Sequence, residues 1–318
     1  MASCTSAILL VGGMGTRMQP LTFSTPKPML PLLGKPITEH QILKAKVAGI
    51  TEIVLATSYL AEVFLPYFGN GEKFGINISY AVEESALGTG GAIRNAAQLL
   101  KNDGPVMIFN GDVLSGHSLD DQIAFHESRS ADVTLYLTEV EDARAFGVVE
   151  MSGDRITTFN EKMENPPTNV INAGCYIFNR SVIDEIPAAK VVSVERETFP
   201  ALINRGANVM GFVDDGYWLD IGNPGALLKA TRDLIEVTGY PFMQAKGSTI
   251  DPTAVIDGGS YIGLGAKVAA GAKIHQSVIG DGAIIGENVD LTRVFVSAGT
   301  EIAAKTTAEG EFFGYSQQ

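Results

Sequence analysis

Cysteine is scarce in this chain, whose 318 residues include only Cys4 and Cys175. Two cysteines are too few for a disulfide framework or for a cysteine-rich zinc site. Long apolar runs are also missing, since no stretch approaches the roughly 18 apolar residues of a membrane span. The short apolar run near the N-terminus follows no basic segment, which argues against a secretory signal. We therefore expect a soluble, cytoplasmic protein.

Positive charge is in deficit. The chain has 23 Lys and Arg residues against 36 Asp and Glu residues, a net charge of −13. Nucleic acid or an anionic membrane would require a basic face, so we expect neither as a partner. A phosphate-bearing substrate must then be held by a few local cations and a metal ion. The length and the 45% hydrophobic content allow a large core and more than one domain.

Two common phosphate-binding motifs are absent. A dinucleotide fingerprint would need a glycine in place of Met18, and a Walker motif would need Ser or Thr after Lys35, where Pro36 stands. The chain has instead the segment LVGGMGTRMQPLTFSTPKP, from Leu10 to Pro28, directly after a short apolar run. Its glycines allow a tight turn and a close approach of the backbone to a ligand. An arginine fork and a proline-flanked lysine in the same segment indicate a site for phosphate groups.

This segment closely resembles the signature of the sugar-1-phosphate nucleotidyltransferases, the pyrophosphorylases that make nucleotide sugars. The resemblance implies that the glycine loop wraps the nucleotide and that Arg17 and Lys27, both catalytic, hold the triphosphate. The nucleotide-binding residues expected on this basis are Leu10, Gly12, Gly13, Gly15, Thr16, Arg17, Lys27, Glu83, Gly88, Thr89 and Asn110.

In the first two thirds of the chain, apolar strand-like runs alternate with amphipathic segments. Val106 to Phe109 and Gly174 to Phe178 are typical of strands, whereas Thr38 to Ala48 predicts a helix that ends at Gly49. Such alternation predicts an α/β fold, a Rossmann-like mixed sheet covered by helices. Ligands of such sheets bind beyond the carboxyl ends of the strands.

Near residue 245 the pattern changes to a hexapeptide period. Aliphatic residues recur every six positions, with two steps of five, at Ile250, Ile256, Ile262, Val268, Ile274, Ile279, Ile285, Leu291, Val296 and Ile302. This period predicts a short parallel β-helix of about three coils. Several family members carry a left-handed one. We place a catalytic domain at residues 1–243 and the β-helix at 244–318, where it packs on the first domain or builds a homo-oligomer.

Two aspartates are candidate metal ligands. Asp112 follows a strand in the sequence FNGD, and Asp220 lies between Leu219 and Ile221, where an unpartnered carboxylate would be costly. Mg²⁺ is bound through a few carboxylates together with phosphate oxygens of the substrate. The family resemblance assigns the metal to these two positions, which are also catalytic. No acid/base dyad or Ser–His pair is needed, because a sugar 1-phosphate is already mostly dianionic, with a second pKa of about 6.

The candidate sugar phosphate site contains Gly147, Glu161, Lys162 and Asn172. Each alone is more typical of a solvated turn, but their order and spacing resemble the FG, EK and NAG segments of the family. The resemblance implies that Glu161 and Asn172 contact sugar hydroxyls and that Lys162 meets the sugar phosphate. We expect in-line displacement of pyrophosphate without a covalent enzyme intermediate.

The substrates are narrowed by two observations. A carboxylate at Glu83 or Glu84 can accept both N1–H and N2–H₂ of guanine, although an exposed acidic loop is about as plausible. The segments FNGDVLSG, INAGCYIF and VSVERETFPAL are most similar to bacterial mannose-1-phosphate guanylyltransferases. GTP and mannose 1-phosphate are thus the first choice, and glucose 1-phosphate with dTTP or UTP is the alternative.

Two other classes stay open. A hexapeptide β-helix can be an acyltransferase, but the β-helix has a single histidine, His275, next to a core position. A non-catalytic regulatory or scaffold relative would share both domains. Catalysis is favoured because the chain has all five signature residues, Arg17, Lys27, Asp112, Lys162 and Asp220.

Overall fold

The computed structural model describes residues 4–13, 15–57, 61–83 and 85–316. The chain divides into two compact units. Within the described residues, unit 1 comprises 4–13 and 38–218, and unit 2 comprises 15–37 and 219–316. Each unit is described by itself. The two compact units are divided at other positions than residues 243 and 244. The predicted domain boundary there stays a prediction.

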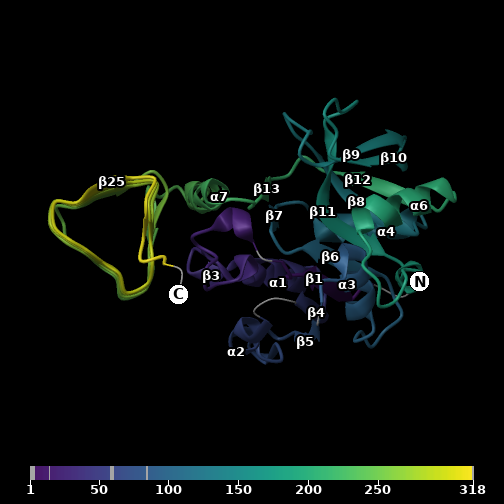
Figure 1. The fold of residues 1–318 in the computed structure, drawn as a ribbon, viewed down its shortest axis with the longest axis horizontal. Coiled ribbons are helices and arrows are strands. Elements are labelled where there is room, and N and C mark those ends of the chain that lie inside the picture. Colours follow the sequence, from purple (N-terminus) through teal and green to yellow (C-terminus); the bar gives the residue numbers. More distant parts are fainter. Residues whose placement is uncertain (1–3, 14, 58–60, 84, 317–318) are drawn as a thin grey trace. The chain divides into compact units, whose positions relative to one another are not determined.

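Unit 1 is built on a nine-stranded mixed sheet (Figure 1). Its strands are, in spatial order, β5 (Asn77–Val82), β4 (Glu52–Thr57), β1 (Ser6–Leu10), β6 (Val106–Asn110), β11 (Val170–Phe178), β8 (Val133–Glu139), β12 (Val209–Val213), β10 (Arg155–Glu161) and β9 (Gly147–Ser152). Strands β5, β4, β1 and β6 are parallel, whereas β11 is antiparallel to both of its neighbours β6 and β8. The expected mixed α/β sheet is confirmed.

Several helices accompany this sheet, and α1 (Ile37–Val47) lies where Thr38 to Ala48 predicts a helix. The others are α2 (Phe64–Phe68), α3 (Gly88–Ala97), α4 (Leu119–Ser128), α5 (Arg180–Asp184), η5 (Val194–Thr198) and α6 (Phe199–Asn204), with short η3 (Ala61–Val63) and η4 (Glu72–Phe74) turns. Helix α1 ends before Gly49, whose φ of 81° favours glycine. Helix α4 begins with Ser118, whose hydroxyl accepts the N–H of Asp121 at 3.1 Å.

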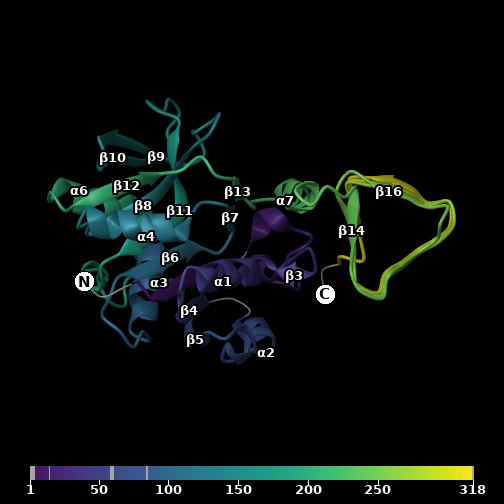
Figure 2. The ribbon, with the colours of Figure 1, turned by 180° about the vertical axis from the view of Figure 1, so that it is seen from behind.

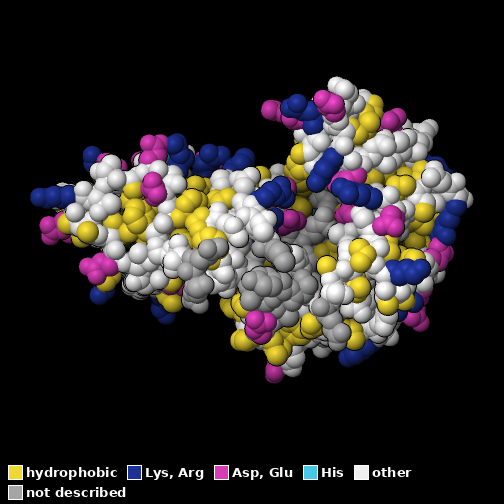
Figure 3. All heavy atoms as spheres, viewed as in Figure 1, with side chains coloured by type: hydrophobic (Ala, Val, Ile, Leu, Met, Phe, Trp, Pro, Cys, Tyr) yellow, Lys and Arg dark blue, Asp and Glu magenta, His cyan; other side chains and the backbone are white. Residues whose placement is uncertain are grey.

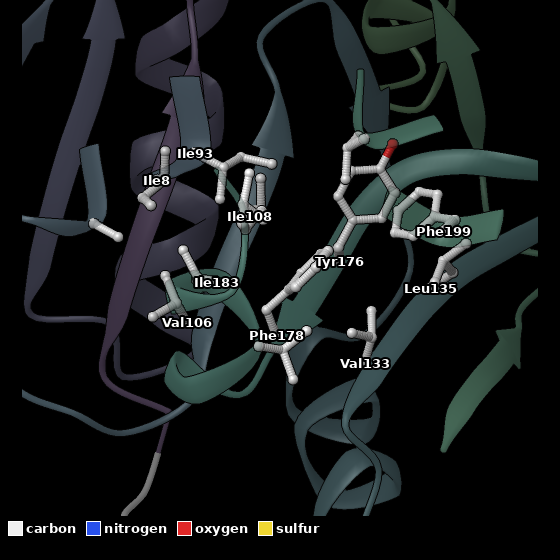
Figure 4. Close-up of a cluster of buried hydrophobic side chains, with 14 of the residues drawn as sticks. Ile8, Ile93, Val106, Ile108, Val133, Leu135, Tyr176, Phe178, Ile183 and Phe199 are labelled. Carbon is white, nitrogen blue, oxygen red and sulfur yellow. The ribbon is translucent and has the colours of Figure 1, made fainter. Parts of the chain in front are cut away.

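The core of unit 1 is closed by large side chains from β11 and the helices that cover it (Figure 4). The rings of Tyr176 and Phe178 lie 5.2 and 5.9 Å from the ring of Phe199 at the start of α6. All three side chains are fully buried. Burial of one such ring stabilises the fold by about 1.5–3 kcal/mol, so this cluster fixes β11 relative to the segment around η5.

Unit 2 contains a parallel β-helix whose three sheets form the sides of a triangle (Figures 1 and 2). The sheets have five, four and four strands, in the orders β14-β17-β20-β23-β26, β15-β18-β21-β24 and β16-β19-β22-β25. The strands are β14 (Phe242–Gln244), β15 (Thr249–Ile250), β16 (Val255–Asp257), β17 (Ser260–Ile262), β18 (Lys267–Val268), β19 (Lys273–His275), β20 (Val278–Ile279), β21 (Ile284–Ile285), β22 (Asp290–Thr292), β23 (Phe295–Val296), β24 (Glu301–Ile302), β25 (Thr307–Glu309) and β26 (Phe312–Phe313).

The β-helix is longer than the period alone predicts. Four full coils are present rather than about three, because β14 and the strands β25 and β26 extend the helix beyond the aliphatic pattern. The arrangement is consistent with the expected left-handed β-helix. Its two five-residue steps are regular features: Ile274 pairs with Leu291, which is 17 positions further on, and each short step passes through a left-handed residue, Gln276 or Arg293.

The rest of unit 2 consists of short elements. They are η1 (Thr16–Met18), η2 (Lys27–Met29), the two-stranded β2 (Pro31–Leu32) and β3 (Lys35–Pro36), and α7 (Pro224–Glu236). Helix α7 packs against β2 and β17. On the face drawn in Figure 3, basic and acidic side chains are interspersed over the β-helix. In the described part of the chain, no helix has the length and apolar character of a membrane span.

Candidate active site

The loop that carries Asp112 begins at the carboxyl end of β6. Leu10 and Asn110 pair in register as the last residues of the parallel strands β1 and β6. The N–H of Gly111 donates to the Leu10 carbonyl at 2.9 Å, and a Cβ on Gly111 would lie 2.4 Å from that oxygen. Only glycine fits this close approach without a backbone shift. The turn therefore places Asp112 directly beyond the strand ends, where α/β sheets bind ligands.

The predicted glycine loop leaves β1 with an open backbone. Gly12 and Gly13 are both exposed, and Gly13 has a φ of 111°. A Cβ on Gly13 would meet nothing within 4 Å among the described atoms. Glycine is thus required at this position by the backbone conformation, and a ligand can approach it closely.

In unit 2 the same loop closes on Gly15, which has a φ of 58°. A Cβ on Gly15 would lie 3.0 Å from Cβ of Lys27 and 3.3 Å from Cγ2 of Thr22. The hydroxyl of Thr22 donates to the Gly15 carbonyl at 2.9 Å. Thr16 and the exposed Arg17 follow in the short helix η1. The structure thus brings Gly15, Thr16, Arg17 and the backbone of Lys27 into one compact loop.

Asp220 is held between a strand and a helix of unit 2. It is the half-buried last residue of β13 (Trp218–Asp220), and a Cβ on Gly222 would lie 3.0 Å from its Oδ2. Asn223 then accepts the N–H of Ala226 at 3.0 Å and caps α7. The carboxylate is therefore placed by ordered secondary structure, which suits a ligand of a metal ion.

The two predicted metal ligands belong to different units, Asp112 to unit 1 and Asp220 to unit 2. Within residues 4–13, 15–57, 61–83 and 85–316, no group of three or more His, Cys, Asp or Glu side chains forms a metal site. Two hard carboxylates fit Mg²⁺, which completes its coordination with water and substrate phosphates.

On the base side, Glu83 shapes its own loop. Its N–H donates to the Thr57 carbonyl at 3.0 Å, and its Oε2 accepts the N–H of Leu87 at 3.1 Å. Burial raises the pKa of the Glu83 carboxyl, and the bond from Leu87 lowers it in part. One carboxylate oxygen is thus used within the loop. The alternative candidate, Glu84, lies outside the described residues.

Gly88 and Thr89 start helix α3 against a distant segment. A Cβ on Gly88, whose φ is 70°, would lie 2.5 Å from the Val192 carbonyl. The hydroxyl of Thr89 donates to Oε2 of Glu195 at 2.7 Å and accepts the N–H of Val194 at 2.9 Å. Both hydrogen-bonding directions of the hydroxyl are therefore used within the protein. The hydroxyl therefore has no hydrogen left to donate to a base, and the predicted contact of Thr89 is through its backbone.

The predicted sugar residues lie on paired strands. Gly147, the first residue of β9, pairs with Glu161, the last residue of β10, and a Cβ on Gly147 would lie 3.0 Å from Oε2 of Glu161. Lys162 follows in a left-handed conformation with φ 58°, and its Nζ is 4.0 Å from Oε1 of Glu161. The Lys162 side chain is 61% exposed, so its ammonium group can reach a substrate phosphate. The structure brings these three residues together.

Asn172 lies in β11, beside β9. Its Nδ2 donates to the Tyr176 hydroxyl at 2.8 Å, and its Oδ1 accepts the N–H of Gly174 at 3.1 Å. These bonds span the irregularity in the register of β11 between Asn172 and Tyr176. The side chain thus shapes the strand as well as being available at its edge.

Two residues that the sequence analysis did not single out connect these parts. Tyr176 is bonded by the side chains of both Asn172 and Asn110, one from each predicted subsite. Glu195 accepts hydrogen bonds from Thr89 and, at 2.9 Å, from the Ser193 hydroxyl. Burial raises the pKa of the Glu161 carboxyl, and the charge of Glu195 raises it further. Glu195 therefore bonds Thr89 and affects the pKa of Glu161, residues of two different predicted subsites.

Neither residue gives a clear signal in the sequence. Tyr176 lies in an apolar run, which predicts a buried core residue, and its side chain is in fact fully buried. Glu195 lies within the segment VSVERETFPAL, which resembles the family as a whole but gives this residue no signal of its own. Its bond to Thr89 joins residues 106 positions apart, and such a contact cannot be read from local spacing.

The chain matches a family model described as "Nucleotidyl transferase" over residues 6–237. A relative from Mycobacterium tuberculosis named "Mannose-1-phosphate guanylyltransferase" is 46% identical over 287 residues, which cover 87% of this chain and 80% of the relative.

Solved structures share the fold. A putative glucose-1-phosphate thymidylyltransferase from Bacillus anthracis, solved with a sucrose, superposes with a TM-score of 0.65 at 23% identity and covers 71% of this chain and 93% of that one. HddC from Yersinia pseudotuberculosis, complexed with GMP-PN, superposes with a TM-score of 0.62 at 27% identity and covers 72% and 99%.

Proposed function

The chain belongs to the nucleotidyl transferase family, and we propose that its reaction is the transfer of a guanylyl group from GTP to mannose 1-phosphate, giving GDP-mannose and pyrophosphate. The observation that carries the proposal is the 46% identity, over 87% of the chain, to a protein named mannose-1-phosphate guanylyltransferase. The GMP-PN complex of HddC supports a guanine nucleotide independently.

Arg17 and Lys27 would hold the phosphates of GTP. The compact loop around Gly15 keeps these two cations on one short segment. A planar guanidinium and a compact ammonium group bind phosphate oxygens in complementary ways. Charge neutralisation of this kind lowers the barrier to attack on the α-phosphorus, because the transferred group carries charge in the transition state.

Lys162 would hold the phosphate of mannose 1-phosphate, next to Glu161 for the sugar hydroxyls. A dianionic phosphate oxygen needs no protein base, since its second pKa is about 6. That oxygen forms a bond to the α-phosphorus, while the bond from this phosphorus to the bridging oxygen of the β-phosphate breaks. Pyrophosphate takes the electron pair and leaves, and orientation of the two phosphates supplies most of the catalysis.

Asp112 and Asp220 would hold the metal ion. Nucleotidyl transferases generally use a divalent metal such as Mg²⁺, and two carboxylates without nitrogen or sulfur ligands fit it. A bound Mg²⁺ supplies positive charge beside the phosphate oxygens. The residues of this chain orient the carboxylates through the Gly111 turn and the start of α7.

The proposal is tested by pyrophosphate release over a grid of GTP, ATP, UTP and dTTP against mannose 1-phosphate and glucose 1-phosphate. We expect the highest kcat/KM for GTP with mannose 1-phosphate. A clear preference for glucose 1-phosphate with dTTP or UTP would overturn the substrates and keep the reaction. No release for any pair would overturn the reaction itself. Homo-oligomerisation and a cytoplasmic location stay predictions. Light scattering, which measures the mass of the protein in solution, tests the first of them.

A further inference from the structure

The loop between Asn110 and Val113 is hydrogen-bonded to a side chain of helix α1. Nε2 of Gln41 donates to the Asn110 carbonyl at 2.8 Å and to the Val113 carbonyl at 2.9 Å. These two carbonyls flank Gly111 and Asp112. A single amide group therefore fixes both ends of the turn that presents the candidate metal ligand.

The orientation of the Gln41 amide is set by these bonds. Both hydrogens of its NH₂ group are donated, and the residue is only 5% exposed. Loss of this buried donor removes one hydrogen bond from each of the two carbonyls, which costs more at a buried site than at an exposed one. The opposite side of the turn is fixed by the Gly111–Leu10 hydrogen bond. Asp112 thus sits on a turn held from two sides.

A second side chain of α1 extends this support. Lys44 lies three residues after Gln41, on the same face of the helix. Its Nζ donates to the Ser115 carbonyl at 2.8 Å and to the Ser115 hydroxyl at 3.0 Å. The strand β7 (Val113–Ser115) is therefore attached to α1 at both ends, and the turn before it cannot shift without breaking these bonds.

The contact also includes space for about one water molecule. A cavity of about 20 Å³ is lined by residues that include Gln41, Asn110, Ser115 and Gly174, and a single water needs about 10–15 Å³. Oε1 of Gln41 and Oδ1 of Asn110 are buried, and neither has a hydrogen-bond partner within the described part of the chain. A water in this cavity can donate to such oxygens.

We propose that Gln41 is a positioning residue, which sets the geometry of Asp112 for the metal ion by holding the carbonyls of Asn110 and Val113. The proposal rests on the proposed function, in which Asp112 binds Mg²⁺. Gln41 itself touches neither metal nor substrate. Loss of a group that orients a metal ligand commonly lowers metal affinity by about 10–100-fold. Here the oriented group is the backbone turn that carries Asp112.

The test is the variant Gln41→Met, which keeps the length of the side chain and removes both donors. We expect the Mg²⁺ concentration for half-maximal activity to rise by about 10-fold, with the KM for mannose 1-phosphate unchanged. Mn²⁺ binding to the protein with GTP, followed by electron paramagnetic resonance, should weaken by a similar factor. The matched control is Thr134→Val, which removes another buried polar group of unit 1; its hydroxyl bonds His126 and no residue of the Asp112 turn or its Lys44 support.

Wild-type Mn²⁺ affinity and Mg²⁺ dependence in folded Gln41→Met would overturn the proposal, as would an equal effect in Thr134→Val. If Gln41→Met fails to fold, Gln41→Asn keeps a neutral amide that is one methylene too short to bond both carbonyls, and it is held to the same criteria. The variant Asp112→Asn separates a failure of the metal assignment at Asp112 from a failure of the positioning role of Gln41. Unchanged Mn²⁺ binding in that variant would refute the metal assignment of the proposed function rather than the role of Gln41.

Discussion

Replacement of His117 by asparagine should flatten the pH dependence of the stability of unit 1. Nδ1 of His117 lies 3.2 Å from Nζ of Lys44 and 3.1 Å from the Ser115 hydroxyl, while Nε2 faces Oε1 of Gln122 at 3.0 Å. The ring also stacks on Tyr136, with centroids 3.7 Å apart. An imidazole that accepts from an ammonium group must be neutral, because a second proton would face the charge of Lys44.

The magnitude follows from the pKa. Burial, and then the charge of Lys44, lowers the pKa of His117 from 6.5 to about 3. The folded state therefore binds fewer protons than the unfolded state between these values, so the stabilisation is complete above pH 6.5 and is lost as the pH falls. Full titration corresponds to about 5 kcal/mol. Between pH 7.5 and 5.5 the loss from this group alone is about 1.4 kcal/mol.

The assay is urea unfolding at these two pH values, which lie above the pI of about 4.8. Trp218 is the single tryptophan of the chain, and its Nε1 donates to the Ala173 carbonyl at 3.0 Å within unit 1. Its fluorescence reports the unfolding of that unit. His117→Asn should lose about 1.4 kcal/mol less than the wild type over this interval. Equal losses in the two proteins would refute the reasoning, whatever their absolute stabilities.

Four further outcomes are expected. Lys27→Ala should lower kcat/KM for GTP by about 100-fold, and near-normal kinetics would contradict its role. Gly111→Ala should lower kcat/KM by 10-fold or more while the protein stays folded by circular dichroism, because its Cβ would meet the Leu10 carbonyl at 2.4 Å. Glu195→Gln should lower the pKa of the Glu161 carboxyl, followed by NMR titration of its carboxyl carbon, since the charge of Glu195 raises that pKa in addition to burial; an unchanged pKa would argue against this coupling. Ile285→Ala in the β-helix core should cost about 2–5 kcal/mol by thermal denaturation, and a cost below 1 kcal/mol would mean that the site collapses without a cavity.

The sequence predicts those features that depend on local spacing. Alternating apolar runs give the mixed sheet, and Gly49 gives the end of α1. The hexapeptide period gives the β-helix because each inward residue follows the last at a fixed distance along the chain. The length of the helix was underestimated since its terminal coils use Phe242 and Phe313 near the core in place of aliphatic residues.

The interior of the candidate site is less predictable. The sequence places Asp112 just after the strand Val106 to Phe109, and the structure has that strand with one further residue, Asn110. The side chains that support the site come from far away in the sequence. Gln41 reaches a carbonyl 72 positions on, and Glu195 reaches Thr89. Only the three-dimensional packing of α1 and η5 shows these partners.

The central claim is tested most directly by the fate of the α-phosphate. GTP labelled at the α-phosphorus is incubated with mannose 1-phosphate, Mg²⁺ and the intact protein, and the products are separated by ion exchange. We predict label in GDP-mannose, with one unlabelled pyrophosphate released for each labelled product. Label that stays in GTP would contradict the substrates, and label in free GMP alone would contradict the transfer.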